Sequence, residues 1–300
     1  MNVVESARAF SDALEDARRT GGCIGFVPTM GALHGGHRSL IERAVRECDL
    51  AAVSIFVNPL QFDRADDLER YPRQLATDLE LCADLGVDVV FAPEVSELYP
   101  DWPQPPVTRV TVGPEAAAWE GAERPGHFEG VTTVVAKLFA LVGRCRAYFG
   151  EKDFQQLVVI RRMVRDLGFP VELVACPTVR EPSGLALSSR NGRLDAGQRA
   201  AARVLSRALA TGARMINEGQ RDPAKVSDAV GKVVASEPSA LLRYAAVVDA
   251  ETLSVPELLG TRPVRILVAA EVGGVHLIDN CDPSVFAHEF AAEEPACNVA

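Results

Sequence analysis

The chain lacks the features of a secreted or membrane-spanning protein. Its seven cysteines are scattered with no close pair in sequence, so we expect no disulfide framework but reduced thiols in a cytoplasmic protein. The longest apolar stretch, 131–142, contains Lys137 and is too short to cross a bilayer, which predicts a buried helix. Charged residues between Arg8 and Asp16 interrupt the amino-terminal segment, so we expect neither a signal peptide nor a membrane partner.

The chain also lacks an excess of basic residues. Its formal net charge of −10 argues against nucleic acid as a partner, because general binding to nucleic acid needs a basic surface. With 300 residues, of which 48% are hydrophobic and 24% charged, the composition is that of an ordinary globular protein. This length favours two domains over one, each able to bury a substantial core.

Short apolar runs alternate with helical patterns in the first part of the chain. This alternation predicts an α/β fold with a Rossmann-like parallel sheet that is covered on both faces. Ligands of such sheets bind at the carboxyl ends of the strands. The expected strands cover 24–27, 51–57, 88–91, 147–149 and 171–175, and the expected helices cover 37–47, 74–85, 131–142 and 154–166.

The pattern changes after the fifth predicted strand. Asp195 and Gln198 form a capping arrangement that opens a long alanine-rich helix through Ile216. We therefore expect one domain over 1–178 and a smaller C-terminal α/β domain over 179–300. The other elements expected in the second domain are a helix over 224–234 and strands over 244–248 and 265–269.

The most informative motif is a glycine-rich turn that follows the first predicted strand. His34 and His37 lie three residues apart at the start of a helix, so their side chains are on one side of it. Free backbone N–H groups and the helix dipole favour an anion there, and the glycines allow a ligand to approach closely. The motif suits a nucleotide phosphate, although glycine-rich turns that bind nothing are common. Its members are Pro28, Thr29, Met30, Gly31, Ala32, Leu33, His34, Gly35, Gly36 and His37.

The same two histidines leave a zinc site open as an alternative, because imidazole is a good zinc ligand. The third ligand would be His127, one of only five histidines in the chain. No glutamate lies between His34 and His37, as a hydrolytic zinc helix would need. Zinc is therefore the weaker interpretation of this motif.

A second motif places two hydroxyls and a guanidinium in succession, at Ser188, Ser189 and Arg190, after the flexible segment 181–184. Such donors on a mobile segment suit the transient binding of a polyphosphate while a leaving group departs. By itself, this stretch is more often a solvated loop. Together, the histidine pair and this loop resemble the two phosphate motifs of adenylate-forming nucleotidyltransferases.

A third motif, over 148–157, again combines the end of a strand, a turn and the start of a helix. Lys152 supplies a point charge for phosphate, and Asp153 can hold a magnesium ion that bridges phosphate oxygens. Gln156 offers a donor and an acceptor to a polar substrate. The structural alternative is that Asp153 only caps the helix that follows.

Taken in order, these motifs resemble the pantoate–β-alanine ligase family of the HIGH-motif nucleotidyltransferase superfamily. The resemblance runs from about residue 24 to about residue 280 and therefore covers nearly the whole chain. Five motifs in the same order make it highly specific. The five motifs are 28–37, 56–62, 71–73, 150–156 and 187–191, and the segments 124–128 and 277–280 fit the same family.

The resemblance implies an AMP-forming ligase that makes a C–N amide bond in pantothenate biosynthesis. ATP, accompanied by Mg²⁺, first adenylates (R)-pantoate and releases pyrophosphate. The amine of β-alanine then attacks the enzyme-bound pantoyl adenylate, which gives pantothenate and AMP. Because the protein forms no covalent bond in this scheme, positioning and charge stabilisation should dominate catalysis.

The resemblance also implies a role for each motif. The groups that stabilise charge as pyrophosphate leaves are His34, His37, Lys152, Ser188, Ser189 and Arg190, and His37 is the better proton donor. The nucleotide site is lined by residues 28–37, by Gly150, Glu151, Lys152 and Asp153, and by Val179, Leu187 and the Ser-Ser-Arg loop. Pantoate is held by Gln61 and Gln156, while the further candidates near pantoate or β-alanine are Asn58, Tyr71 and Arg124.

Two motions and an assembly state follow as expectations. The second domain should close over ATP as a lid hinged near 178–182, and the acidic segment 63–69 should form a flap beside pantoate. The resemblance implies a homodimer. Three other classes of protein stay open: a nucleotidyltransferase that joins nucleotides or transfers AMP to phosphopantetheine, a zinc hydrolase built on His34, His37 and His127, and a non-catalytic adenylate-sensing module.

Overall fold

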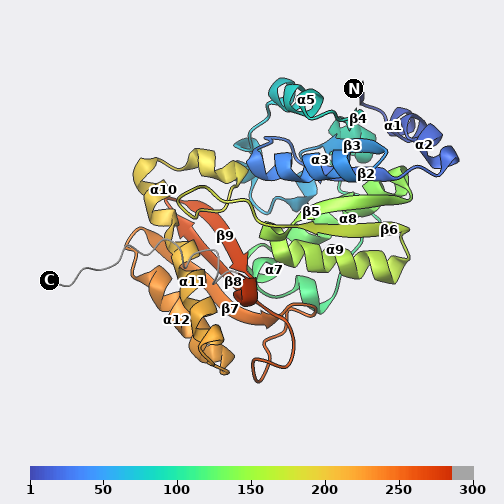
Figure 1. Cartoon of the computed structure of the whole chain (residues 1–300). Coiled ribbons are helices and arrows are strands. Elements are labelled where there is room, and N and C mark those ends of the chain that lie inside the picture. Colours follow the sequence, from blue (N-terminus) through green and yellow to red (C-terminus); the bar gives the residue numbers. More distant parts are fainter. Residues whose placement is uncertain (286–300) are drawn as a thin grey trace. The chain divides into compact units, whose positions relative to one another are not determined.

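The structure is a computed structural model that describes residues 1–285. The chain divides into two compact units, Met1–Val179 and Arg180–Ala300. Each unit has its own sheet and its own buried core (Figure 1).

The first unit is built on a six-stranded sheet in which all neighbouring strands are parallel. The strand order is β1-β4-β3-β2-β5-β6. The α/β class predicted from the alternating pattern is therefore confirmed. The strands are β1 (Asn2–Val4), β2 (Ile24–Thr29), β3 (Leu50–Ile55), β4 (Val89–Phe91), β5 (Cys145–Gly150) and β6 (Val171–Cys176).

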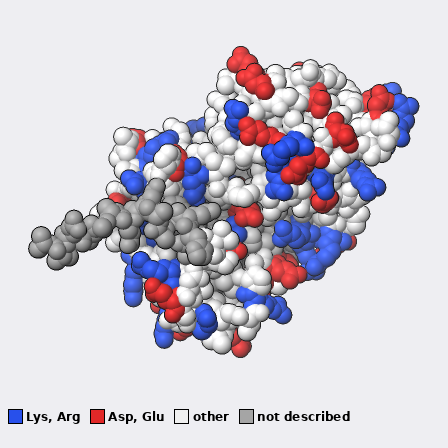
Figure 2. All heavy atoms as spheres, viewed as in Figure 1, with Lys and Arg blue, Asp and Glu red and all other residues white. Residues whose placement is uncertain are grey.

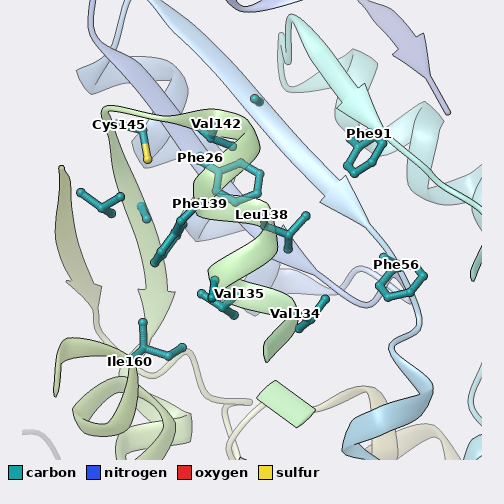
Figure 3. Close-up of a cluster of buried hydrophobic side chains, with 14 of the residues drawn as sticks. Phe26, Phe56, Phe91, Val134, Val135, Leu138, Phe139, Val142, Cys145 and Ile160 are labelled. Carbon is teal, nitrogen blue, oxygen red and sulfur yellow. The ribbon is translucent and has the colours of Figure 1, made fainter. Parts of the chain in front are cut away.

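Helices cover both faces of this sheet. Successive strand residues point to opposite sides, and apolar side chains on both sides are buried by helices. Phe26 packs in one core with side chains of α1, α8 and α9, whereas Val27 packs in a second core with side chains of α3 and α5. Figure 3 shows the first core, in which Phe139, Leu138 and Val142 of α8 lie around Phe26. These helices are α1 (Ala7–Ala13), α3 (Gly35–Glu47), α5 (Leu75–Asp84), α8 (His127–Val142) and α9 (Phe154–Leu167).

The remaining helices of the first unit are short. They are α2 (Glu15–Thr20), α4 (Ala65–Glu69), α6 (Val95–Leu98) and α7 (Glu120–Glu123), with 3-10 turns at Pro59–Gln61, Pro114–Ala116 and Glu151–Asp153. The proline-rich stretch after α6, residues 99–106, is a mostly exposed connection, but Tyr99 at its start is buried. Helix α8 confirms the buried helix predicted over 131–142.

The second unit has a three-stranded antiparallel sheet in the order β7-β8-β9. Its strands are β7 (Ala240–Asp249), β8 (Val264–Val272) and β9 (Val275–Cys281). Helices α11 (Val204–Asn217) and α12 (Pro223–Ala235) supply apolar side chains to a core shared with this sheet.

One expectation for the second unit is wrong. The capping box of Asp195 and Gln198 is present, but the helix it opens, α10 (Ala196–Ala202), ends before Ile216 is reached. The chain turns at Arg203, whose backbone N–H bonds back to the carbonyls of Ala200 and Ala201, and α11 then starts at Val204. The alanine-rich composition favours helix on both sides of this break and gives no local signal for it.

The surface has a mixed distribution of charge. On the face seen in Figure 2, basic and acidic side chains are interspersed. Among the described residues, no helix combines the length and the apolar character that crossing a bilayer requires.

Candidate functional site

The candidate site of the first unit lies where the strand order of the sheet reverses. From β2 the chain proceeds to β3 and β4 on one side, and it later adds β5 and β6 on the other side. Ligands of open parallel sheets bind at the carboxyl ends of the strands at such a switch point. The loops after β2, β3 and β5 contain the first-unit motifs 28–37, 56–62 and 150–156, and β2 pairs with both of the other strands.

The loop after β2 holds both histidines at the start of α3. His34 is the N-cap residue, and its Nδ1 accepts a hydrogen bond from the backbone N–H of Gly36 at 3.1 Å. The Nδ1 of His37 accepts from the backbone N–H of His34 at 3.4 Å, which completes a reciprocal capping box. The two ring centroids are 4.2 Å apart. The pair of imidazoles therefore replaces the usual Ser and Glu of such a cap.

This capping fixes the proton on each ring. A neutral imidazole has one N–H and one bare nitrogen, and a nitrogen that accepts a hydrogen bond must be bare. Because both Nδ1 atoms accept, the proton of each neutral ring lies on Nε2. His34 and His37 can then each donate one hydrogen bond to an anion at the helix start.

Burial and neighbouring charges keep both rings neutral. The pKa of His37 is lowered to about 3, mainly by burial and also by His34 and Lys152, while Asp153 opposes the shift. The pKa of His34 is lowered mainly by burial and then by Lys152. Because Lys152 and Asp153 change the pKa values of both histidines, the loop after β5 lies close to the loop after β2, as the sequence motifs predict.

A carboxylate on α5 binds the backbone of the same loop. Asp78 is 1% exposed and accepts the backbone N–H groups of Ala32 and Leu33 at 2.9 Å and 2.8 Å. Ala32 has a positive φ of 51°, and the Cβ of any side chain at Gly31 would lie 2.9 Å from Asp78 Oδ2. Asp78 could not be singled out from the sequence, because an acidic residue near the start of a helix is commonly part of an ordinary cap.

Lys152 and Asp153 lie in the 3-10 turn between β5 and α9. Their side chains are 3.5 Å apart, between Nζ and Oδ1, and Lys152 is much the more buried of the two. Asp153 is the N-cap residue of α9, but its side chain makes no capping hydrogen bond. The structural alternative considered for Asp153 is therefore wrong.

The loop after β3 presents Gln61 on a buried polar scaffold. Asn58 is 1% exposed, and its Nδ2 donates to Gln61 Oε1 and to the carbonyl of Gly130, both at 3.0 Å. Its Oδ1 accepts from Tyr99 Oη at 2.9 Å and from the Leu60 backbone N–H at 3.3 Å. These partners use the hydrogen-bonding capacity of the Asn58 amide, which supports a positioning role for this residue.

The backbone of Gln61 is held as firmly as its side chain. Arg124 Nη2 donates to the Gln61 carbonyl at 3.1 Å, and His127 Nδ1 lies 2.8 Å from the same oxygen. Arg124 also pairs with Asp63 at 3.0 Å, which ties the first residue of the expected flap to α7 and α8. Tyr71 is buried and packs edge-on against Phe62. Arg124 thus contacts Gln61 directly, and Tyr71 contacts its neighbour Phe62.

Two adjacent glutamines at the start of α9 have different surroundings. Gln155 is 5% exposed, accepts the Glu120 backbone N–H at 3.0 Å, and donates to the carbonyls of Glu115 and Ala118 at 2.9 Å and 2.8 Å. Gln156 is half-buried, and its side chain makes no hydrogen bond with any of residues 1–285. Gln155 therefore anchors the fold, and Gln156 has an amide that a ligand can use.

The Ser-Ser-Arg loop belongs to the second unit. Ser188 caps the 3-10 turn Ser189–Arg193, with its Oγ accepting the Arg190 backbone N–H at 3.3 Å. The buried Asn191 donates to the Ala186 carbonyl at 2.9 Å. Leu187 lies in the same loop, whereas Val179 is the last residue of the first unit, after β6. Within the first unit, the structure brings His34 and His37 near Lys152 and Asp153, and it brings Asn58 and Arg124 to Gln61. Ser188, Ser189 and Arg190 are residues of the second unit.

The donor set does not form a resident metal site. Within residues 1–285, no three His, Cys, Asp or Glu side chains are arranged to hold a metal ion, which leaves the zinc alternative without support. A single carboxylate such as Asp153 fits a magnesium ion that arrives bound to phosphate oxygens, since Mg²⁺ commonly uses one or two carboxylates plus substrate phosphates.

Comparison with known proteins gives one consistent result. The family model for pantoate-beta-alanine ligase matches residues 2–282. The pantothenate synthetase of Rubrobacter xylanophilus is 51% identical over 282 residues, which cover 93% of this chain and 97% of the relative. That of Agrobacterium fabrum is 48% identical over 99% of both chains.

Solved structures give the same picture. The crystal structure of pantothenate synthetase from Thermus thermophilus has a TM-score of 0.87 and 48% identity, covering 94% of this chain and 99% of that one. A pantoate-beta-alanine ligase from Francisella tularensis, complexed with beta-gamma ATP and beta-alanine, has a TM-score of 0.75 and 34% identity over 95% and 98% of the two chains.

Proposed function

Because this chain belongs to the pantoate–β-alanine ligase family, we propose that it joins pantoate to β-alanine at the expense of ATP. The products are pantothenate, AMP and pyrophosphate. The enzyme is an AMP-forming ligase that makes an amide bond. The relative from Francisella tularensis that was solved with an ATP analogue and β-alanine supports both co-substrates.

The reaction has two displacement steps. A carboxylate oxygen of pantoate attacks the α-phosphorus of ATP, the bond from that phosphorus to the bridging oxygen breaks, and pyrophosphate leaves. The amine of β-alanine then attacks the acyl carbon of pantoyl adenylate, the acyl–oxygen bond breaks, AMP leaves, and the nitrogen loses a proton. Neither step needs a protein nucleophile, so the site acts by positioning and by stabilising charge.

The observation that carries this proposal is the position of three loops at the switch point of the sheet. The loop after β2 offers the Nε2–H groups of His34 and His37 and the start of α3, and the loop after β5 offers the ammonium of Lys152. These groups suit the phosphates of ATP. The loop after β3 offers Gln61 beside them, for pantoate.

The neutral state of His37 has a mechanistic consequence. A ring with a pKa near 3 is not an imidazolium at neutral pH, so it has no acidic second proton to transfer. In the free protein it therefore acts only as a hydrogen-bond donor, through Nε2–H. A bound triphosphate adds negative charge next to the ring and raises its pKa. His37 can therefore act as a proton donor to pyrophosphate only when ATP is bound.

Gln61 and Gln156 are the proposed pantoate ligands. Gln61 Oε1 is occupied by Asn58, whereas its Nε2 donates no hydrogen bond to residues 1–285 and is suited to an oxygen of the substrate. A neutral amide can hold the carboxylate without the ion pair that would reduce its nucleophilicity. We place Asn58, Tyr71 and Arg124 around Gln61 as residues that position it.

The second unit supplies the remaining part of the proposal. Ser188, Ser189 and Arg190 would bind the departing pyrophosphate, with the unit acting as a lid and Val179 and Leu187 lining the nucleotide site. Asp153 would hold the Mg²⁺ of the nucleotide, which supplies charge neutralisation on the phosphates. We also propose that the enzyme is a cytoplasmic homodimer, with 63–69 as a flap beside pantoate.

Isotope exchange between pyrophosphate and ATP tests the function directly. Exchange that requires pantoate but not β-alanine is expected, because adenylation is reversible before the amine arrives. Release of AMP should then require β-alanine. A protein that binds ATP yet supports no exchange with pantoate would exclude the ligase and favour an adenylate-sensing module.

A further inference from the structure

Two cysteines that are distant in sequence meet at the end of β2 that lies away from the histidine loop. Cys23 immediately precedes β2, and Cys48 is the C-cap residue of α3. Their Sγ atoms are 2.8 Å apart. A disulfide bond is about 2.05 Å long, so the sulfurs need to approach each other by only about 1 Å or less. We propose that Cys23 and Cys48 form a reversible intramolecular disulfide.

The backbone around the two sulfurs is held in place by other interactions. The Cys23 N–H donates to Asp49 Oδ2 at 2.7 Å, and the Cys23 carbonyl accepts the backbone N–H groups of Asp49 and Leu50 at 2.9 Å and 3.2 Å. The Cys48 N–H bonds to the carbonyl of Ala44 within α3. These bonds fasten both sides of the pair, so bond formation does not require either segment to be rebuilt.

Exposure distinguishes this pair from the other described cysteines. Cys23 and Cys48 are both half-buried, whereas Cys82, Cys145, Cys176 and Cys281 are buried. A small oxidant in water can therefore reach the pair more readily than it can reach the other four thiols. Reactivity of cysteine depends on such access together with the thiolate fraction.

The two sulfurs have different roles in the reaction. Burial and the neighbouring thiol of Cys23 raise the pKa of Cys48, although Tyr148, whose Oη lies 3.5 Å from Cys48 Sγ, opposes this effect. A thiol with a raised pKa is a weak attacking group near neutral pH. The first attack is therefore assigned to Cys23, and Cys48 resolves the product.

The oxidant is a peroxide. The Cys23 thiolate attacks one peroxide oxygen, the O–O bond breaks, and the other oxygen leaves as water, which gives a sulfenic acid. The Cys48 sulfur attacks the Cys23 sulfur, the S–O bond breaks, and a second water carries away the Cys48 proton. Two electrons pass from the two sulfurs to the peroxide. A dithiol reductant reverses the bond by exchange.

The bond joins the start of β2 to the end of α3 and leaves the other ends of both elements untouched. His34 and His37 lie at those other ends, more than ten residues from either cysteine along the chain. We therefore expect the disulfide to stabilise the β2–α3 segment against heat and to protect both thiols from further oxidation. It should not block the phosphate loop.

Peptide mapping of the full chain after treatment with hydrogen peroxide tests the proposal. Trypsin cuts after Arg19, Arg38, Arg46 and Arg64, so Cys23 and Cys48 fall in different peptides. The expected product is one linked peptide pair with two hydrogens fewer than its parts, which dithiothreitol separates. The melting temperature of the oxidised protein should rise by about 3–5 °C, a scale typical of a stabilising cross-link in a chain of this size.

Substitutions provide the matched controls. Cys23→Ser should abolish the linked pair, and Cys82→Ser, at a buried thiol on α5, should leave it unchanged. Unlinked peptides that carry sulfinic acid at Cys23 or Cys48, or a link from either residue to Cys145 or Cys297, would overturn the proposal. Peptide mapping does not depend on enzymatic activity, so its result tests the disulfide separately from the proposed function. Exchange between pyrophosphate and ATP should stay within about twofold after oxidation.

Discussion

Asp78 accepts the backbone N–H of Ala32 at 2.9 Å, across 46 residues of sequence. The same carboxylate takes the N–H of Leu33 at 2.8 Å. One buried and one half-buried N–H group of the histidine loop therefore have a charged partner that comes from α5 and not from the loop itself. Hydrogen bonds to a charged group contribute more than neutral ones, and an unsatisfied buried group is costly. Asp78 is thus a positioning residue for the proposed phosphate site.

Asp78→Asn tests that relationship. The amide keeps the shape of the side chain but can accept only through one oxygen, so one of the two loop N–H groups loses its partner. We expect unfolding free energy to fall by about 1–3 kcal/mol and the KM for ATP to rise by about tenfold. Asp84→Asn, at an exposed position at the end of the same helix, should change neither quantity. An Asp78→Asn protein with unchanged KM for ATP would remove Asp78 from the site.

His37→Ala and Lys152→Ala test charge stabilisation in the adenylation step. Each variant removes one group placed to stabilise the leaving pyrophosphate, and such groups are usually worth about 100-fold or more in rate. The measurement is the rate of pyrophosphate release in a single turnover with saturating ATP and pantoate. Arg38→Ala, at an exposed position of the same helix turn, serves as the control and should retain the normal rate. Near-normal release by either active-site variant would contradict its assigned role.

The low pKa of His37 predicts how stability depends on pH. The ring has a pKa of about 3 in the folded protein and about 6.5 when unfolded, so the unfolded state binds the extra proton first. The stabilisation is fully present above pH 6.5 and is lost as the pH falls from 6.5 towards 3. The slope contributed by this one group approaches about 1.4 kcal/mol per pH unit. Urea unfolding at several pH values should show this slope, and it should be smaller in His37→Gln.

Gln156→Ala and Gln155→Ala form a matched pair on adjacent residues. Gln156→Ala should raise the KM for pantoate about tenfold with the melting temperature and ATP affinity kept, because its amide has no protein partner among residues 1–285. Gln155→Ala leaves the Glu120 N–H and two carbonyls without their partner, and it should lower unfolding free energy by about 1–3 kcal/mol. Equal loss of ATP affinity in Gln156→Ala would mean that the residue is placed wrongly.

The fold of the first unit is predictable because its signals are local. Each of the five expected strands is present within a few residues, since buried parallel strands appear as apolar runs between helical patterns. Strand β1 has only three residues and carries no pattern of its own. It pairs with β4, which lies more than 80 residues away in sequence, and pairing over that distance is not visible in a short window.

The candidate site is predictable to the extent that its residues lie in continuous motifs. His34, His37 and Lys152 follow strands directly, so their positions could be inferred from the chain alone. Asp78, Tyr99 and Gly130 could not, because each reaches the site through tertiary packing. The same limit explains why Gln155 and Gln156 look alike in sequence.

Gly130→Ala tests how closely α8 must approach the loop that carries Gln61. A Cβ at Gly130 would lie 2.4 Å from the Leu60 carbonyl oxygen and 2.7 Å from the Gln61 backbone nitrogen. Both atoms belong to backbone, so neither can rotate away, and the loop itself must shift. In a helix without such contacts, the same change is favourable by up to about 1 kcal/mol.

We therefore expect Gly130→Ala to lose stability and pantoate affinity together. The displaced loop moves Gln61 and weakens the bond from Asn58 Nδ2 to the Gly130 carbonyl. Overpacking of this kind typically costs about 1–3 kcal/mol, and the KM for pantoate should rise more than the KM for ATP. Gly197→Ala in α10 is the control, because its Cβ would meet only Asp195 Oδ1 at an ordinary 3.4 Å. If Gly130→Ala proved as stable as that control, with normal pantoate kinetics, α8 would have no part in placing Gln61.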